Sequence, residues 1–120
     1  MTHELFLAPA ARADIVDALE WSVKNFGDTV RDGYEALIIA AINLIRDDPT
    51  VLGSRERDDL ATGLRTLHLR ACRDEVSPAV RRIASPRHFV VYRQVGKVIQ
   101  VVRLLHEAMD IPAQRIPNSG

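Results

Sequence analysis

The sequence predicts an α+β fold, in which an N-terminal strand, an antiparallel helical hairpin and a three-stranded antiparallel meander form a small sheet packed on the helices. Two observations predict it. Apolar residues recur at helical spacing through two adjoining segments of the first half, and apolar, β-branched runs flank a glycine turn in the second half. At 120 residues, 47% hydrophobic and 27% charged, the chain matches one globular domain, and we predict a single domain over residues 1–120.

A short strand and a long helix open the chain. The apolar run at residues 5–8 ends at Pro9, which lacks an N–H group for a sheet but suits the first turn of a helix. We predict a helix over residues 9–26 that stops at Gly27. Its inner face is expected to consist of Ala11, Ile15, Ala18, Leu19, Ser22 and Phe26.

A second helix follows almost at once. Asp28 is placed to cap it through its side-chain oxygen, and the sequence "DDPT" at residues 47–50 ends it. The predicted inner face consists of Tyr34, Leu37, Ile38, Ala41, Ile42 and Ile45. The short connection makes the two helices an antiparallel hairpin, and Trp21 and Tyr34 occupy positions that favour packing roles.

The second half of the chain predicts three strands. Residues 51–63 are polar and rich in turn formers, so we expect a loop that leads into a strand at "LRTLHLRA", residues 64–71. An inserted loop at about residues 71–86 follows, with one helical turn at residues 78–83. The segments "HFVVYR" and "KVIQVVRLL" then form a hairpin around the turn "QVG".

The last predicted strand is apolar on both faces, which is typical of a central strand. Simple alternation points Ile99, Val101 and Leu105 toward one face and Val98, Val102 and Leu104 toward the other.

Two arginines interrupt the apolar strands of this hairpin. Alternation places Arg93 on the face of Phe89 and Val91, and Arg103 on the face of Val101 and Leu105. Such an arginine is either half-buried against a carboxylate of the same chain, or held for a phosphate, a carboxylate or a partner protein. The sequence leaves both interpretations open.

Charge and cysteine content exclude several classes of function. Lys and Arg together number 16, as do Asp and Glu, so there is no overall positive field to attract DNA or an anionic membrane. Cys72 is the only cysteine and is expected to be a buried, inert thiol. Without a signal peptide pattern or an apolar window of about 18 residues, we expect a cytoplasmic protein with no membrane partner.

Neither a metal site nor a cofactor is expected. The four histidines and Cys72 do not stand at the spacings of zinc sites. The chain also lacks a glycine-rich dinucleotide motif, a Walker lysine motif and a Gly-x-Ser-x-Gly elbow.

A polar cluster follows the last predicted strand and includes His106, Glu107, Met109 and Asp110. His106 could act as a general acid or base, since an unperturbed histidine pKa is about 6.5, and Glu107 or Asp110 could orient it. The alternative is a structural histidine at the end of a strand.

Several phrases resemble the ParE toxins of the RelE/ParE family, found in bacterial type II toxin-antitoxin modules. They are "LAPAARADI", "FGD", "LIRDDP", "GLRTLHL", "HFVVYR" and "VIQVVRLLHEAMDIP", and together they span most of the chain. The resemblance implies a non-enzymatic toxin that inhibits DNA gyrase and replication, and that a cognate ParD-like antitoxin holds inactive in a hetero-oligomeric complex. The inserted loop at about residues 71–86 is longer than the connection expected in that family.

The resemblance also implies a functional surface for the target that comprises Arg93, Arg103, His106, Met109 and Asp110. Acidic residues of an antitoxin segment would suit Arg65, Arg70, Arg93 and Arg103.

Two alternatives stay open. RelE-type relatives are ribosome-dependent mRNA endoribonucleases, and that function would use Arg93, Arg103, His106 and Glu107 here. The tail after Met109 contains no Tyr, Phe or His, which leaves the proton transfers of RNA cleavage unassigned. The other alternative is a non-toxic family member that only binds an antitoxin.

Overall fold

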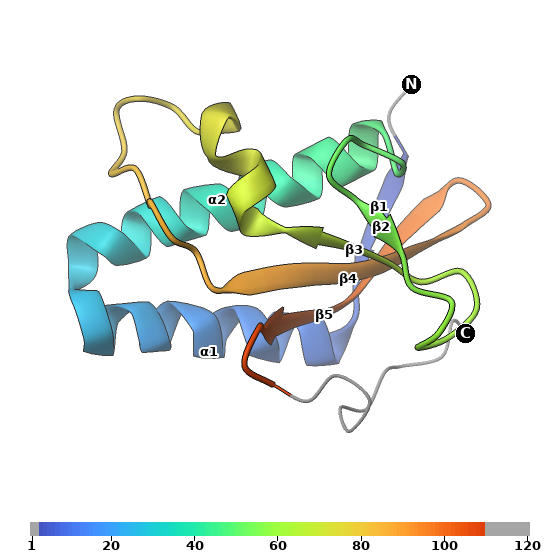
Figure 1. Cartoon of the computed structure of the whole chain (residues 1–120), viewed down its shortest axis with the longest axis horizontal. Coiled ribbons are helices and arrows are strands. Elements are labelled where there is room, and N and C mark those ends of the chain that lie inside the picture. The colour runs from blue at the N-terminus through green and yellow to red at the C-terminus, as the bar shows by residue number, and fades with distance from the viewer. Residues whose placement is uncertain (1–2, 110–120) are drawn as a thin grey trace.

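The computed structural model describes residues 3–109, which form two long helices, a mixed sheet and one 3-10 helix (Figure 1). In chain order the elements are β1 (Glu4–Leu7), α1 (Pro9–Phe26), α2 (Asp28–Asp47), β2 (Arg55–Glu56), β3 (Arg65–His68), the 3-10 helix η1 (Leu69–Glu75), β4 (His88–Val95) and β5 (Val98–His106). The predicted α+β class is confirmed. Neither described helix combines the length and the apolar character of a bilayer span.

The strands lie in the order β1-β5-β4-β3-β2, so β5 is an inner strand, as predicted. β1 runs parallel to β5, whereas β2, β3, β4 and β5 pair antiparallel with their neighbours, which confirms the meander. One strand was missed. Arg55 and Glu56 pair with β3, although their polar surroundings predicted only a loop. A two-residue strand carries too little alternation to be recognised in a sequence.

The first helix has its predicted bounds, the second ends at Asp47 as predicted but begins one residue earlier than predicted, and Gly27 is their junction. Gly27 has a φ of 89°, which side chains rarely adopt, and its N–H donates to the carbonyl of Val23 at 2.9 Å. The prediction that Asp28 caps α2 is wrong, because Gly27 precedes the first helical residue and no side-chain cap bond is present. With a single residue between the helices, Asp28 is already helical and its side chain cannot fold back as a cap.

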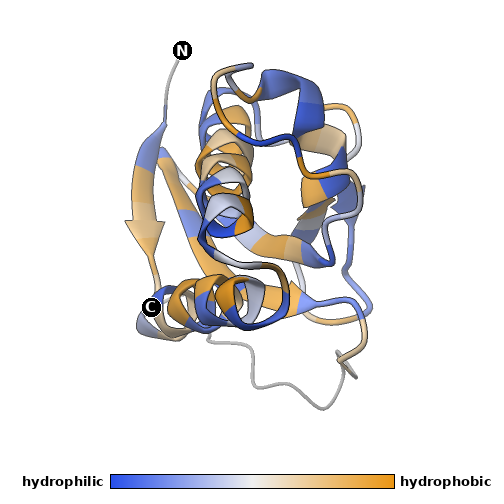
Figure 2. Cartoon of the chain, turned by 90° about the vertical axis from the view of Figure 1, so that its left-hand side faces the viewer, coloured by the Kyte–Doolittle hydropathy of each residue, from blue (hydrophilic) through white to orange (hydrophobic). Residues whose placement is uncertain are grey.

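The main core lies between the two helices and the sheet, where hydrophobic parts of both meet (Figure 2). All six predicted inner residues of α2 are buried, Tyr34 among them. On α1 the predicted face is buried at Ala11, Ala18, Leu19 and Ser22, but the Phe26 side chain is 60% exposed because it ends the helix. Cys72 is buried as predicted, and burial raises the pKa of its thiol to about 11.

A smaller cluster covers the other face of the sheet. It comprises Leu64, Phe89, Val91, Val102 and Leu105, with Leu60 and Ala61 packed against it. A bulge shifts the β4–β5 register, since Val91 faces Arg103 whereas Tyr92 faces Val101. The extra residue, Val102, reverses the alternation beyond it.

The faces predicted for Leu104 and Leu105 are therefore wrong, whereas Val102 lies opposite to Val101 as predicted. Leu104 packs in the main core together with Val101, and Leu105 belongs to the smaller cluster. The predicted shared face of Arg103 and Val101 is also wrong, because Arg103 pairs with Val91 and Val101 pairs with Tyr92, which lie on opposite faces of β4. The Arg103 side chain reaches Asp14 on α1.

The strand predicted over residues 64–71 is shorter in the structure. It ends at His68, whose side chain accepts a hydrogen bond from the Arg70 N–H at 3.1 Å and so caps η1. The predicted helical turn at residues 78–83 is absent, and the helical segment of this connection is η1. The connection bends back over α2 before it enters β4 (Figure 1).

Gly33 on α2 gives the connection its closest approach to the helix. A Cβ atom at this position would lie 2.3 Å from the carbonyl oxygen of Arg81 and 3.0 Å from a side-chain carbon of Ile83. Gly33→Ala is expected to lower the free energy of unfolding by about 1 kcal/mol, since the clash outweighs the helix propensity gained. Urea unfolding measures this, with Asp32→Ala as the exposed control; a Gly33→Ala protein as stable as the control would contradict the packing.

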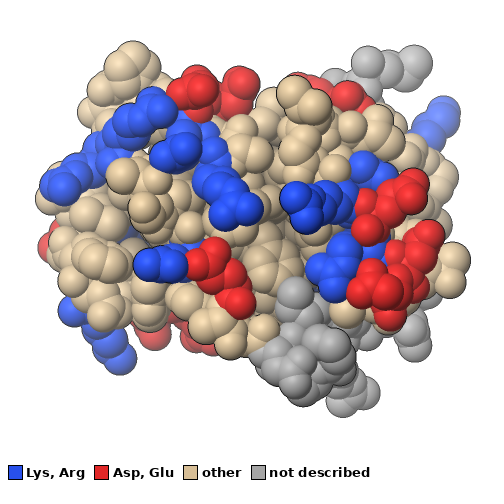
Figure 3. All heavy atoms as spheres, viewed as in Figure 1, with Lys and Arg blue, Asp and Glu red and all other residues tan. Residues whose placement is uncertain are grey.

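Charged side chains are unevenly spread over the face that Figure 3 shows. Lys and Arg gather at the upper left, over η1 and the connection to β4, and acidic groups gather at the right, beside the loop between β2 and β3.

Candidate functional site

Four rings from distant parts of the chain meet at one end of the sheet, and we call them the histidine cluster: Trp21, Tyr34, His88 and His106. His88 and His106 face each other across β4 and β5, with ring centroids 5.0 Å apart. Trp21 from α1 contacts His88 and His106 edge to face at 5.3 and 5.4 Å. Tyr34 from α2 contacts His88 at 5.4 Å.

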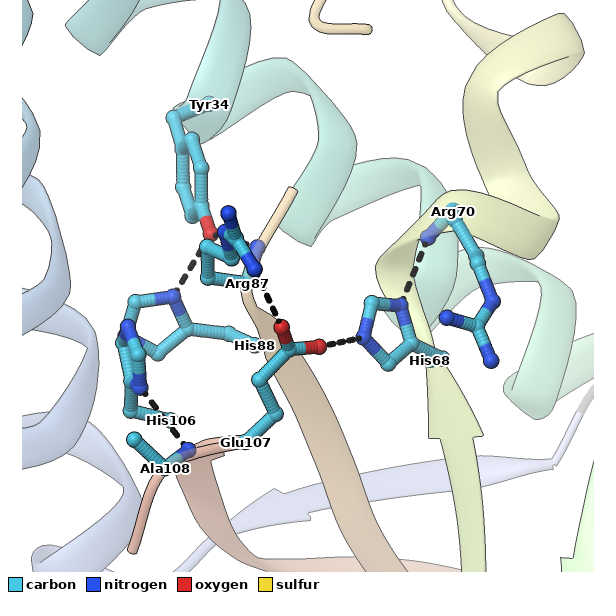
Figure 4. A network of polar contacts seen from close by, with 8 residues as sticks. All are labelled: Tyr34, His68, Arg70, Arg87, His88, His106, Glu107 and Ala108. Atoms are coloured by element: carbon cyan, nitrogen blue, oxygen red, sulfur yellow. Dashed lines mark hydrogen bonds and ion pairs between the residues drawn. The ribbon is translucent and has the colours of Figure 1, made fainter. Parts of the chain in front are cut away.

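Hydrogen bonds fix the protonation of His88. The backbone N–H of Arg87 donates to the Tyr34 hydroxyl at 2.8 Å, so the hydroxyl proton is directed at His88 Nδ1, 2.6 Å away (Figure 4). Burial, with a smaller contribution from the nearby His106, lowers the pKa of His88 to about 4. Burial also raises the pKa of Tyr34 to about 12. His88 is therefore a neutral, structural acceptor near neutral pH.

Glu107 forms a second set of contacts beside the histidine cluster. Its carboxylate accepts a hydrogen bond from the Arg87 guanidinium at 2.8 Å, and its other oxygen lies 2.9 Å from His68 Nε2. These bonds, that with Arg87 first, lower the pKa of Glu107 to about 2. Because the Arg70 N–H donates to His68 Nδ1, the His68 proton lies on Nε2 and points at Glu107.

Arg103 meets a carboxylate of the same chain. Its Nε and a terminal nitrogen donate to the two oxygens of Asp14 on α1, at 2.6 and 3.0 Å. The backbone N–H of Leu104 donates to the same carboxylate at 3.0 Å. The two side chains are 14% and 12% exposed, and the hydrogen bond to Asp14 raises the pKa of Arg103. This pair ties α1 to β5.

The other sequence-predicted arginines lie apart from the histidine cluster. Arg65, at the start of β3, donates to the Ser54 hydroxyl at 2.7 Å and lies 3.6 Å from Glu56. Arg93 is 8% exposed in β4, and burial lowers its pKa. Arg70 is exposed on η1, just beyond the opposite end of β3.

His106 and Met109 lie together, whereas the Glu107 side chain lines the neighbouring cavity with Arg87. Asp110 lies outside the described residues. The Ala108 N–H donates to His106 Nδ1 at 3.0 Å, which leaves the other ring nitrogen as the proton carrier. His106 and Met109 line a surface hollow of about 450 Å³ with Asp17, Trp21 and other residues of α1 and β5.

Sequence reasoning missed Asp14, His68, Arg87 and His88 as members of this region. Their partners are distant in sequence, as for Asp14 and Arg103 or His68 and Glu107. The sequence feature that could have indicated this region is the position of His88 and His106 at the ends of the two strands of the predicted hairpin.

The arrangement offers little for proton transfer. Both nitrogens of His68 and both oxygens of Glu107 already have hydrogen-bond partners, and a carboxylate with a pKa near 2 is a weak base. Among residues 3–109, no three His, Cys, Asp or Glu side chains are grouped to hold a metal ion.

Comparison with known proteins yields consistent matches. A family model described as "ParE toxin of type II toxin-antitoxin system, parDE" matches residues 5–111. The chain is 27% identical over 112 residues to Toxin ParE1 from two strains of Mycobacterium tuberculosis, covering 92% of this chain and 96% of that protein.

Among solved structures, a chain of the chromosomal ParDE TA system from P. aeruginosa superposes with a TM-score of 0.61 at 19% identity, covering 88% of this chain and 96% of that one. This similarity shows a shared fold. A chain of the E. coli DinJ-YafQ complex aligns with a TM-score of 0.49 at 15% identity, covering 90% and 96% of the respective chains.

Proposed function

Because the chain belongs to the ParE toxin family of type II toxin-antitoxin systems, we propose that it inhibits DNA gyrase, and that a cognate ParD-like antitoxin neutralises it in a hetero-oligomeric complex. The proposed site of action is the cytoplasm, where gyrase and its DNA are found. The family match over residues 5–111 is the observation that carries the proposal. No cofactor is part of it.

The polar contacts favour gyrase inhibition over RNA cleavage. A ribonuclease needs a base, an acid and a cation placed at the developing phosphorane charge. The Arg103 guanidinium is instead held by Asp14, and Glu107 is held between Arg87 and His68. These residues would have to break their present contacts before they could serve in cleavage.

The proposed target surface comprises Arg93, Arg103, His106, Met109 and Asp110. Support for His106 and Met109 comes from the hollow that both line, in which an aromatic wall and a 43% exposed methionine suit an apolar anchor of a partner. Arg103 would support this surface from beneath, through its bonds to Asp14. For the antitoxin, Arg65, Arg70, Arg93 and Arg103 remain the proposed contacts of acidic residues.

The purified protein is expected to block gyrase supercoiling of plasmid DNA while leaving ribosome-bound mRNA intact. His106→Ala and Met109→Ala should each raise the concentration for half inhibition by about tenfold, as for a residue central to an interface. Val16→Ala, which truncates an exposed side chain of α1, is the matched control.

Cleaved mRNA together with unimpaired supercoiling would overturn the proposal in favour of a ribonuclease. Unimpaired gyrase supercoiling together with intact mRNA, combined with normal growth on expression without antitoxin, would indicate a non-toxic antitoxin-binding protein. If His106→Ala and Met109→Ala inhibit gyrase as well as Val16→Ala does, the target surface lies elsewhere.

A further inference from the structure

Three arginines surround a polar cavity of about 210 Å³ at the end of the sheet, and we call it the arginine pocket. Arg70 and Arg73 come from η1, and Arg87 comes from the residue before β4. The remaining lining residues are Ala84, Ser85, Pro86 and Glu107. The long connection between β3 and β4 thus builds most of this pocket.

The charges of the arginine pocket are only partly compensated. Arg73 donates to the carbonyl oxygens of Ala84 at 2.6 Å and Arg70 at 3.3 Å, which are neutral acceptors that fix the guanidinium without cancelling its charge. Arg70 is exposed, and its side chain forms no ion pair with residues 3–109. Only Arg87 has a carboxylate partner there, Glu107. Two positive charges therefore remain at one concave site of a chain whose formal net charge is zero.

The pocket already binds one carboxylate, its own Glu107. That side chain lies between Arg87 and His68, at 2.8 and 2.9 Å, and is 35% exposed. The geometry therefore accepts a carboxylate from the solvent side, and Arg70 and Arg73 are placed to receive a second one. Arginine is suited to this role because its planar donors match the two oxygens of a carboxylate.

We propose that the arginine pocket binds an Asp or Glu side chain of an acidic segment in a partner protein. A cavity of about 210 Å³ is smaller than a typical small-molecule site of about 300 Å³ or more, and it holds one acidic side chain. A chain whose formal net charge is zero lacks the overall positive field that attracts a nucleic acid strand, so a single acidic side chain is the better match for a site of this size. Naming the antitoxin as that partner rests on the proposed function.

The test is a titration of the full chain, at low salt, with acetyl-Ala-Glu-Glu-Ala-amide, followed by NMR of the arginine side-chain N–H groups. The Glu peptide should shift the Arg70 and Arg73 signals with saturation in the millimolar range, and its Gln counterpart should not. Arg70→Gln, which leaves the Arg73 bridge to Ala84 intact, should weaken binding by about threefold to fivefold, as expected for an exposed ion pair.

Glu107→Gln should have the opposite effect, because it removes the carboxylate that competes for Arg87. The Glu107→Gln protein is expected to bind the Glu peptide about threefold more tightly. Local unfolding of the pocket would weaken binding, so a gain in affinity separates the two explanations. Arg55→Gln, which removes an exposed arginine of β2, is the control and should leave the affinity unchanged.

Equal affinities for the Glu and Gln peptides would overturn the proposal. So would an equal loss of affinity for the Glu peptide in the Arg70→Gln and Arg55→Gln proteins. Tighter binding of inorganic phosphate or of a short oligouridine than of the Glu peptide would assign the pocket to phosphate instead. Because the titration contains neither gyrase nor ribosomes, its failure is distinguishable from failure of the proposed function.

Discussion

Asp14→Ala is expected to lower the free energy of unfolding by about 4 kcal/mol, because it leaves the Arg103 charge without its carboxylate partner in a poorly solvated site. The same change removes the acceptor of the Leu104 N–H. The ion pair connects the first helix with an inner strand, so the loss affects the whole fold. Urea unfolding monitored by Trp21 fluorescence measures it.

Two further variants separate the buried charge from other effects of Asp14. Asp17→Ala changes an exposed carboxylate on the same helix and should alter the stability by about 0.5 kcal/mol or less. Asp14→Leu combined with Arg103→Met should recover at least about half of the loss, since a well-packed apolar pair often replaces a buried ion pair without cost. A double variant no more stable than Asp14→Ala would show that the carboxylate acts through the Leu104 N–H instead.

Acidification should destabilise the protein through His88. The folded-state pKa of about 4 lies below the unfolded value of about 6.5, so the unfolded chain binds the proton more tightly between these values. Stability contributed by neutral His88 is present near neutral pH and is lost as the pH falls below about 6.5. Between about pH 7 and about pH 4.5 the expected loss is about 2 kcal/mol.

His88→Asn should remove most of this pH dependence, since the Asn oxygen can accept the Tyr34 hydroxyl proton where Nδ1 now does. His106→Asn, which keeps His88, should retain most of the slope. Among the charges around His88, His106 and His68 lower its pKa, and Asp14 and Glu107 raise it. Glu107 itself titrates near 2, below this window. A His88→Asn protein with the pH dependence of the unaltered chain would assign it to other groups.

Helical periodicity predicted the first helix to the residue and the second to within one residue at its start, because each buries one continuous face against a single sheet. The strands were predicted less well. With regular pairing from the Gly96 turn, His88 would oppose Leu105, and His106 would fall on the other face. The bulge at Val102 instead brings the two histidines together, and a sequence does not reveal where one strand gains a residue.

The partners of the charged residues in the site could not be predicted from the sequence either, because they depend on how distant elements pack. The sequence left open whether Arg103 pairs with a carboxylate of the same chain or binds an external partner. Only the packing of α1 against β5 brings Asp14 to it. Likewise, Glu107 was recognised near the end of the last strand, but its contact with His68 depends on the order of three strands.

The parallel pairing of β1 with β5 also constrains when the protein can fold during synthesis. Residues 4–7 align with residues 98–101, so the first strand has no neighbour in the sheet until almost the whole chain has left the ribosome. The helical hairpin can form early from local contacts, but its apolar face stays uncovered until the inner strands arrive. A ribosome that stalls before about residue 98 therefore releases a helical fragment without the surfaces described above, and such a fragment is a substrate for proteolysis rather than a toxin.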